Sequence, residues 1–530
     1  MNRTLLLGLD GATFAVLDPL MDRGLMPSLK ALVRGGARSD LMSTVNPLTP
    51  LAWTSLITGR TPGHHGIFDF VRVEQTGEYP TFRLSTSSDI RCPTVWSMLT
   101  ERDLVSVSMN FPVMFPPRPF NGFMIPGFVP RRHLQRAMFP PGLHARLSGV
   151  PGVELKELPV DFEEERRSVQ VLEAERQEEW VRFHIRRERQ WFLVMKHLME
   201  TEPWSLAAVI FDGVDKLQHT LWRHIDENCW VEAKATAHDR MIRQLCLDYF
   251  RQLDDLIAGL VAIAGPEARV IVTSDHGFGP SDEIFYVNTW LADNGFLAWR
   301  DDAPIAADGF INPDGMKSAA YLFDWSKTRA YSLTPGSNGI YLREPGAGAG
   351  YQADPARVRA LRQEIRAGLL QVVNPKTGEK VVRDALEREE AYPGPHNHLA
   401  ADLTLRLRDH GFVSVTRSES VVKVRRDIAG AHRPNGIFVA SGPGVRKGLL
   451  LPPLQIVDVS PLLMHGVGLP IPADFEGRFA GEIFDPQWLA AHPAQHTGAA
   501  APAALSEESG MDEEGEATVM ERLRSLGYIE

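Results

Sequence analysis

The run Thr4-Leu5-Leu6-Leu7-Gly8-Leu9 is apolar at nearly every position and is ended by Asp10 and Gly11. Because both faces of such a run are hydrophobic, it predicts a strand that is buried on both sides, as in a parallel sheet. Asp10 interrupts the run too early for the hydrophobic region of a signal peptide. Four further runs of this kind follow along the chain: Leu104–Met109, Leu206–Phe211, Arg269–Thr273 and Gly436–Ala440.

Helical patterns lie between these runs, so the sequence predicts an α/β fold with a mostly parallel central sheet and helices on both faces. We expect one catalytic domain over residues 1–490. The spacing of the strands is uneven, which suggests inserted cap segments at about 117–202 and 281–428 that cover a substrate. Residues 491–518 are rich in Ala, Glu, Gly and Ser and are expected to form a disordered linker. Residues 519–530 regain helical spacing and are expected to form a short C-terminal helix.

The charge balance narrows the classes of function. The 530 residues carry a formal net charge of −11, which argues against nucleic-acid binding. An anionic small substrate remains compatible, because bound metal ions reverse the charge locally. The three cysteines are too few for a disulfide framework, and no apolar stretch is long enough to cross a membrane, so we expect a cytoplasmic protein. The charged run Phe162–Arg189 is interpreted as a solvated, salt-bridged helix.

Carboxylates follow three of the five expected strands. Asp10 follows the first, and Asp212 and Asp215 follow Leu206–Phe211. A single Asp after a strand is usually a helix cap. Several at the carboxyl edge of one sheet indicate a ligand site, because ligands of open α/β sheets bind there. The remaining members of the set are Asp275 with His276, after Arg269–Thr273, and His432, shortly before the last strand.

Asp215 and His219 are four residues apart, which on a helix places both side chains on one face. Asp and His ligands without Cys suit zinc, manganese or iron. Asp212 is a candidate to orient a ligand histidine by a hydrogen bond.

The segment from Thr49 to Gly59 predicts a short helix. Thr49 suits the N-cap, Pro50 the first helical position, and Gly59 the end of the helix. A hydroxyl at the positive end of a helix is placed to stabilise an alkoxide or a phosphate. Taken alone, the same pattern also fits a purely structural cap.

With these motifs in order, the sequence resembles the alkaline phosphatase superfamily, and within it the type I phosphodiesterase and nucleotide pyrophosphatase branch. The stretches Val287–Leu291 and Trp325–Tyr331 also resemble a prokaryotic phosphohydrolase or phosphomutase-like group. The resemblance to the branch is carried by Leu9-Asp10-Gly11, Thr49 through Gly59, Pro62 through Asp69, Asp215-x-x-x-His219, Thr273 through Gly277, and Gly430-Ala431-His432.

The resemblance implies an alkaline phosphatase-like core and a site for two divalent metal ions, zinc foremost, with manganese or iron as alternatives. It implies that Thr49 is the nucleophile, which also binds metal and becomes phosphorylated during hydrolysis of a phosphomonoester or phosphodiester. Two divalent ions and three aspartates leave the site slightly positive, which suits an anionic phosphorylated substrate. The resemblance assigns Asp10, Thr49, Asp275 and His276 to one ion, and Asp215, His219 and His432 to the other.

Two positions depart from the branch. Phe70 stands where an Asn donates to a phosphoryl oxygen, and Trp53 stands where a His is usual. The substrate therefore stays open, with Lys216, Lys327 and His396 as candidate contacts.

Two other functions stay open beside hydrolysis. The first is intramolecular phosphoryl transfer, as in a mutase. The second is a non-catalytic metal-binding role. A sulfatase is disfavoured, because residues 49–53 lack the formylglycine context.

Overall fold

The structure is a computed structural model that describes residues 3–74, 80–159, 174–303, 322–343 and 354–500. The expected C-terminal helix at 519–530 and most of the expected linker lie outside these residues. Each of the five apolar runs forms a strand of the central sheet, and the expected α/β class is confirmed. Their bounds are β1 (Arg3–Leu9), β5 (Ser106–Met109), β7 (Leu206–Phe211), β8 (Ala268–Thr273) and β15 (Asn435–Ser441).

The central sheet has the strand order β16-β2-β15-β8-β1-β7-β5-β6, and β17 pairs with β2. Strand β1 lies between β7 and β8 and is parallel to both. Strands β5 and β6 continue the parallel part beyond β7. The remaining strands are β2 (Ala37–Met42), β6 (Gly122–Ile125), β16 (Leu449–Leu450) and β17 (Leu454–Gln455).

One expected parallel strand runs the other way. Strand β15 is antiparallel to both β8 and β2. The reason is its connection. The chain leaves β8 into β9 (Gly277–Phe285), returns along the antiparallel partner β14 (Val422–Arg433), and passes directly into β15. A strand reached by an out-and-back ribbon must run opposite to the strand from which the ribbon left.

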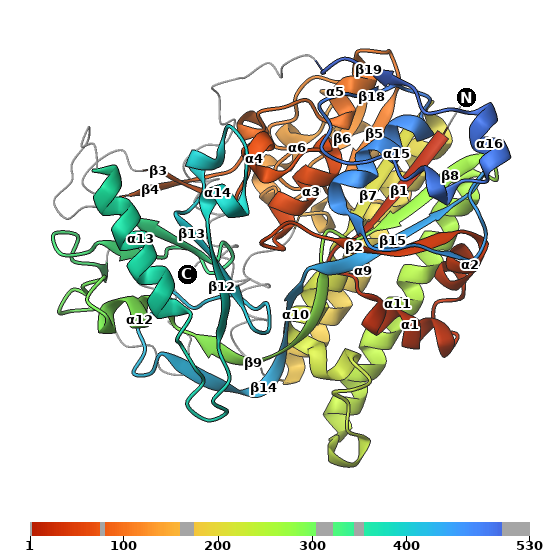
Figure 1. Cartoon of the computed structure of the whole chain (residues 1–530). Coiled ribbons are helices and arrows are strands. Elements are labelled where there is room, and N and C mark those ends of the chain that lie inside the picture. The colour runs from red at the N-terminus through yellow and green to blue at the C-terminus, as the bar shows by residue number, and fades with distance from the viewer. Residues whose placement is uncertain (1–2, 75–79, 160–173, 304–321, 344–353, 501–530) are drawn as a thin grey trace.

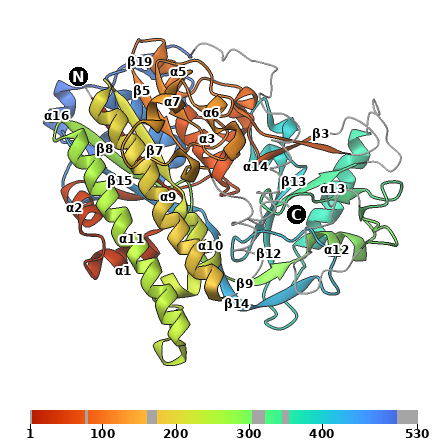
Figure 2. The ribbon, with the colours of Figure 1, turned by 180° about the vertical axis from the view of Figure 1, so that it is seen from behind.

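Helices cover both faces of the sheet, as expected (Figures 1 and 2). The alternation along β1 directs Leu5, Leu7 and Leu9 into the core under one helical layer and Leu6 into the core under the other. The first layer contains α1 (Phe14–Asp22), α2 (Pro27–Gly35), α9 (Ala174–Thr201), α10 (Gly213–Ile225) and α11 (Ala237–Ala264). The second contains α3 (Thr49–Thr58), α5 (Val95–Thr100) and α15 (Val459–Gly466).

The first expected cap, about 117–202, is not a cap where it is described. Its strand β6 extends the central sheet, and its helix α9 packs against α11, β5 and β7. A strand of only four residues gives too weak a periodicity to be read from sequence. The charged run was also interpreted too simply, because Arg187 and Glu188 of α9 are buried. The short elements in this region are η2 (Arg131–His133), α6 (Leu134–Ala137), α7 (Leu143–Ser148) and η3 (Leu155–Glu157).

The second expected insertion, about 281–428, forms a separate module with its own apolar core. The β9–β14 ribbon joins it to the central sheet, and the module lies to one side of that sheet in Figure 1. Its antiparallel sheet has the order β10-β11-β13-β12. The bounds are β10 (Ala330–Tyr331), β11 (Gly339–Leu342), β12 (Val382–Glu387), β13 (Leu403–Leu407), α12 (Val287–Asp293), α13 (Pro355–Leu369), α14 (Arg388–Ala391) and η7 (Asn397–Leu399).

The start of the expected linker is ordered on the core. Strand β19 (His496–Thr497) pairs with β18 (Ile471–Pro472), and α16 (Pro486–Ala491) precedes it. No helix among the described residues is long and apolar enough to cross a membrane. Outside the central sheet, the smaller elements are α4 (Pro62–His65), β3 (Val71–Glu74), β4 (Thr81–Leu84), η1 (Ser87–Asp89), η4 (Glu232–Lys234), η8 (Ile456–Asp458) and η9 (Gly481–Ile483).

Candidate active site

The expected ligands meet at the carboxyl edge of the sheet. Asp10 follows β1, Asp215 lies in the first turn of α10 after β7, and His276 lies between β8 and β9. His432 comes from β14, where it pairs in register with Phe278 of β9. Two groups of side chains have ligand atoms close enough to hold a metal ion: Asp10, Asp275 and His276, and Asp215, His276 and His432.

The first group surrounds the Nε2 atom of His276. That atom lies 3.6 Å from Asp10 Oδ1 and 3.3 Å from Asp275 Oδ2. Thr49 Oγ1 lies 3.4 Å from the same nitrogen, and the threonine side chain is buried. Two carboxylates, one imidazole and one hydroxyl therefore face a common point.

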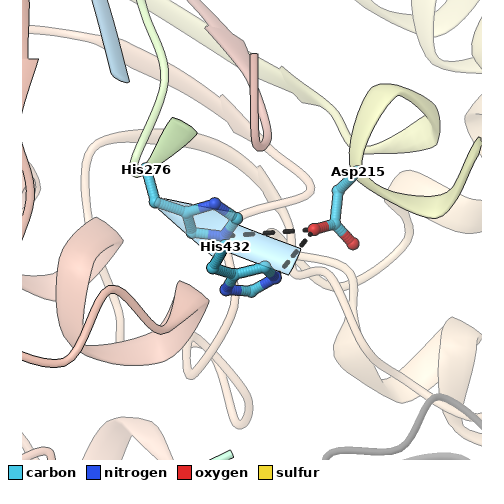
Figure 3. A group of neighbouring side chains, drawn as sticks. All are labelled: Asp215, His276 and His432. Atoms are coloured by element: carbon cyan, nitrogen blue, oxygen red, sulfur yellow. Dashed lines mark ion pairs between the residues drawn. The ribbon is translucent and has the colours of Figure 1, made fainter. Parts of the chain in front are cut away.

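The second group surrounds Asp215 Oδ1, which lies 3.2 Å from His432 Nε2 and 3.4 Å from His219 Nε2. The two imidazole nitrogens are 3.0 Å apart. His276 also borders this group, with its Nε2 4.0 Å from Asp215 Oδ1. Its ring stacks on that of His432 with 3.6 Å between centroids (Figure 3). One histidine therefore contacts both groups.

The second nitrogen of two histidines sets their tautomers. His432 Nδ1 lies 2.7 Å from the carbonyl oxygen of Pro47, and His276 Nδ1 lies 3.1 Å from that of Gly277. A carbonyl only accepts, so each Nδ1–H donates and each Nε2 presents a lone pair to the site. Burial lowers the pKa of His432 to about 4 and that of His276 well below its ordinary value, so both rings are neutral.

The carboxylates are crowded without enough donors. Burial, followed by repulsion from Asp275 and Asp215, raises the pKa of Asp10 well above its ordinary value. Burial likewise raises the pKa of Asp275 to about 8. Burial opposes ionisation of Asp215 too, but the neighbouring Lys216 and His219 outweigh it and lower its pKa. Among the described residues, Asp10 Oδ1 and Asp275 Oδ2 accept no hydrogen bond, so these oxygens are available to a cation.

The helix that carries Thr49 begins one residue earlier than expected. Leu48 is the N-cap, Thr49 is the first helical residue, and Pro50 occupies the second position. Pro50 is compatible with this start of the helix. Backbone N–H groups in the first turn have no helical partner, so the N–H that proline lacks is not missed there. Gly59 ends the helix with a φ of 65°, as expected from sequence. Thr49 thus remains in the first turn, where the helix dipole favours negative charge.

Two neighbours orient the aspartates and were not found from sequence. Trp53 Nε1 donates to Asp10 Oδ2 at 3.2 Å. Gly8 makes room for this indole, since a Cβ at that position would lie 2.6 Å from Trp53 Cη2. The backbone N–H of Gly11 donates to Asp275 Oδ1 at 3.1 Å from a turn with a φ of 69°. The only sequence signal was that Trp53 departs from the family pattern.

The three candidate substrate contacts differ in their placement. Lys216 is buried beside the site, with its Nζ 2.9 Å from Asp215 Oδ2 and 5.4 Å from the ring centre of Phe128. Lys327 is an exposed lysine that pairs with Asp324 in the second module. His396 is half-buried, and its backbone N–H donates to the carbonyl of Gly63 in α4. Only Lys216 contacts a member of the ligand set.

Two further expectations concerned Phe70 and Asp212. Phe70 is buried and packs on Phe128, with ring centres 4.9 Å apart, so it offers apolar surface where the branch has an amide. Asp212 pairs with Arg187 of α9 rather than with a ligand histidine. Asp212 therefore belongs to a second buried cluster beside the site.

The comparison with known protein families covers most of the chain. Residues 4–435 match the family described as Type I phosphodiesterase / nucleotide pyrophosphatase. No curated protein matches the chain.

Two solved structures illustrate the shared fold. Murine ectonucleotide pyrophosphatase / phosphodiesterase 5, in an inactive form with a threonine-to-alanine substitution and in complex with AMP, is 13% identical. The match covers 92% of this chain and 100% of the murine chain, with a TM-score of 0.51. Phosphonoacetate hydrolase from Sinorhizobium meliloti 1021, in complex with phosphonoformate, is 17% identical. That match covers 88% and 95% of the two chains, with a TM-score of 0.51.

Proposed function

The chain belongs to the type I phosphodiesterase / nucleotide pyrophosphatase family and is a phosphoric ester hydrolase, and from that premise we propose that it acts through a phosphothreonine formed on Thr49 with two divalent metal ions. The substrate class is an anionic phosphomonoester or phosphodiester. The observation that carries the proposal is the convergence of three aspartates, three histidines and Thr49 at one edge of the sheet.

The donor set fits metal ions. The neutral rings of His276 and His432 present Nε2 lone pairs to carboxylate oxygens, an arrangement that is repulsive unless a cation lies between them. The oxygens Asp10 Oδ1 and Asp275 Oδ2 accept no hydrogen bond from the described residues, although both aspartates are buried. Imidazole and carboxylate ligands without thiolates suit zinc, with manganese or iron as alternatives.

We assign the ligands by these contacts. Asp10, Asp275, His276 and Thr49 would hold one ion, and Asp215, His219 and His432 the other. His276 borders both groups, so the two ions would share a wall of the site. When bound, two divalent ions supply a lowered pKa for a ligated hydroxyl and stabilise charge on the phosphoryl and leaving oxygens.

The chain's own residues supply the nucleophile and its orientation. Thr49 Oγ forms a bond to phosphorus as the bond to the departing alcohol oxygen breaks. The first turn of α3 favours the negative charge that gathers around Oγ. Water then breaks the Oγ–P bond and regenerates Thr49. The murine protein of similar fold supports an essential threonine, because a threonine-to-alanine substitution inactivates it.

Lys216 gives the site a buried positive charge beside Asp215. Its ammonium offsets the carboxylates and keeps Asp215 ionised, which a metal ligand requires. We therefore assign Lys216 to the support of Asp215, in place of a direct contact with phosphate.

Single turnover in ¹⁸O-labelled water tests hydrolysis against the mutase alternative. Zinc- and manganese-loaded protein is first screened with 4-nitrophenyl phosphate, bis(4-nitrophenyl) phosphate and phosphonates. For a substrate that is turned over, a hydrolase incorporates one water oxygen into the released phosphoryl product. Transfer of the phosphoryl group within the substrate, without label from water, would refute the proposal and support a mutase.

A further inference from the structure

A cavity lies at the amino edge of the central sheet, opposite the edge that carries the aspartate and histidine cluster. It measures about 610 Å³, within the range of about 300–1,000 Å³ that is usual for small-molecule sites. Arg3, the first residue of β1, and Arg269, the second residue of β8, lie at its wall. Helix α15 contributes His465, α16 contributes Trp488, and His492 follows α16. In Figures 1 and 2 the N-terminus and α16 lie close together at this end of the molecule.

Arg269 is the unusual member of this wall. Its residue is only 6% exposed, and its Nε has no hydrogen-bond partner among the described residues. No carboxylate among the described residues pairs with Arg269, although Glu267 lines the same cavity. Burial lowers the pKa of Arg269 to about 10, with no carboxylate to offset it.

The surroundings of Arg269 hold the guanidinium in place but do not neutralise it. Its Nη1 lies 3.2 Å from His465 Nδ1. The Cζ atom of the same guanidinium lies 4.6 Å from the ring centre of Phe484 and 5.5 Å from that of Trp488. His465 Nε2 lies 2.9 Å from the carbonyl of His492, so that nitrogen donates and Nδ1 accepts from the arginine. A neutral imidazole and aromatic rings orient a cation and leave its charge in place.

The missing counterpart is an anion. A buried charge is retained in proteins when it is paired or when it serves a ligand. The planar guanidinium of an arginine matches phosphate and carboxylate oxygens with two parallel hydrogen bonds. Arg3, at the adjacent strand start in register with Ala268, adds a second positive charge at the rim. The cavity is far larger than one such group, so it has room for the organic part of a ligand.

We propose that this cavity binds a small organic molecule through a phosphate or carboxylate group held by Arg269. The site is separate from the aspartate and histidine cluster, because the two lie at opposite edges of the same strands. It requires no metal, and it does not depend on the function proposed above.

Isothermal titration calorimetry of the full chain tests the proposal with AMP, citrate and adenosine. We expect saturable binding of AMP or citrate, whichever oxyanion the cavity takes, and at least tenfold weaker binding of adenosine, which lacks the charge. Arg269→Gln should weaken that binding at least tenfold. Asp215→Asn should leave it unchanged, and so should Arg34→Gln, which alters an exposed arginine of α2 outside the cavity.

Two rim variants keep the test valid if Arg269→Gln fails to fold. Arg3→Gln removes the exposed charge, and His492→Glu brings a carboxylate to the rim, so each should weaken binding severalfold in a folded chain. Absence of saturable binding by both AMP and citrate would overturn the proposal. Binding that Asp215→Asn abolishes and the cavity variants retain would also overturn it, because that ligand would occupy the other edge of the sheet.

Discussion

Two clusters of buried charge lie beside each other after β7, and they differ in how their charge is balanced. In one, Asp212 pairs with Arg187 of α9. Glu188 accepts from the Gly213 N–H at 2.6 Å and from the Tyr249 hydroxyl at 3.2 Å. Burial and the nearby Asp212 raise the pKa of Glu188 to about 8, while Arg187 and Lys216, against the effect of burial, lower that of Asp212 to about 2. At neutral pH the arginine and aspartate charges therefore cancel.

In the other cluster, Asp215 lies three residues later, and the carboxylates meet imidazole lone pairs. Among the described residues, Lys216 is the one lysine or arginine paired with these carboxylates, beside side chains that could hold a metal ion. Burial of charge is thus common to both clusters and does not by itself mark function. What distinguishes the cluster around Asp215 is that Asp10 Oδ1 and Asp275 Oδ2 accept no hydrogen bond from the described residues, which is why we propose that metal ions complete it.

The sharpest test of this contrast is Thr49→Ala. We expect turnover to fall by about 10⁴-fold, because the nucleophile is removed while the fold and the metal ligands of the second group remain. Thr54→Ala is the matched control, since Thr54 is buried on the same helix and its hydroxyl has no hydrogen-bond partner among the described residues. Steady-state rates are measured for both variants, with zinc content measured in parallel. An equal fall in the two rates would contradict the assignment of Thr49 as the nucleophile.

The self-balanced cluster predicts a loss of stability instead. Arg187→Met should lower the free energy of unfolding by about 3–5 kcal/mol, because Asp212 keeps a buried charge without its partner. Adding Asp212→Leu should restore much of that loss. Urea denaturation measures both, with Arg182→Met as the control for an exposed pair on the same helix, where about 0–1 kcal/mol is expected. An equal effect of the two arginine variants would show that burial of the Asp212 pair is unimportant.

Asp275→Asn and Asp212→Asn compare the two clusters directly. The first should weaken metal binding at least about tenfold, because it removes an anionic ligand. It should cost little stability in chelator, since the raised pKa of about 8 means that Asp275 is already protonated there at neutral pH. The second should keep metal affinity and lose stability. Metal titrations measure the first effect, and melting curves in chelator measure the second. Equal metal affinity and equal stability of the two variants would contradict the distinction between the clusters.

The strands of the central sheet could be predicted from the sequence because the signal for each strand lies within the strand itself. Each apolar run was long enough and apolar enough on both faces to indicate a buried strand, and Asp10 and Asp275 followed from strand ends. The direction of β15 was missed, because direction depends on the β9–β14 ribbon rather than on residues within the strand. The same limit applies to β6, whose four residues lie within a stretch interpreted as a cap.

Side-chain environment was harder to predict than position. Arg187 and Glu188 stand in a charged run that resembles a solvated helix, and only the packing of α9 on the sheet buries them. Arg269 was predicted as the first residue of a strand, and the neighbouring sequence does not distinguish it from an exposed arginine. Lys216 is a candidate phosphate contact, and nothing in the sequence indicated its pairing with Asp215. Partners of this kind are brought together from distant parts of the chain, which one sequence does not reveal.

The β9–β14 ribbon has a consequence for the order in which the molecule is built. His276 lies just before the ribbon and His432 is on its returning strand, with the whole second module synthesised between them. A ribosome that has reached the last strand of that module has already released six of the seven expected ligands, but neither His432 nor β15. If the chain binds two metal ions as we propose, the ion assigned to Asp215, His219 and His432 can meet all of its ligands only after the ribbon closes. We therefore expect complete metal loading to follow synthesis through the central sheet.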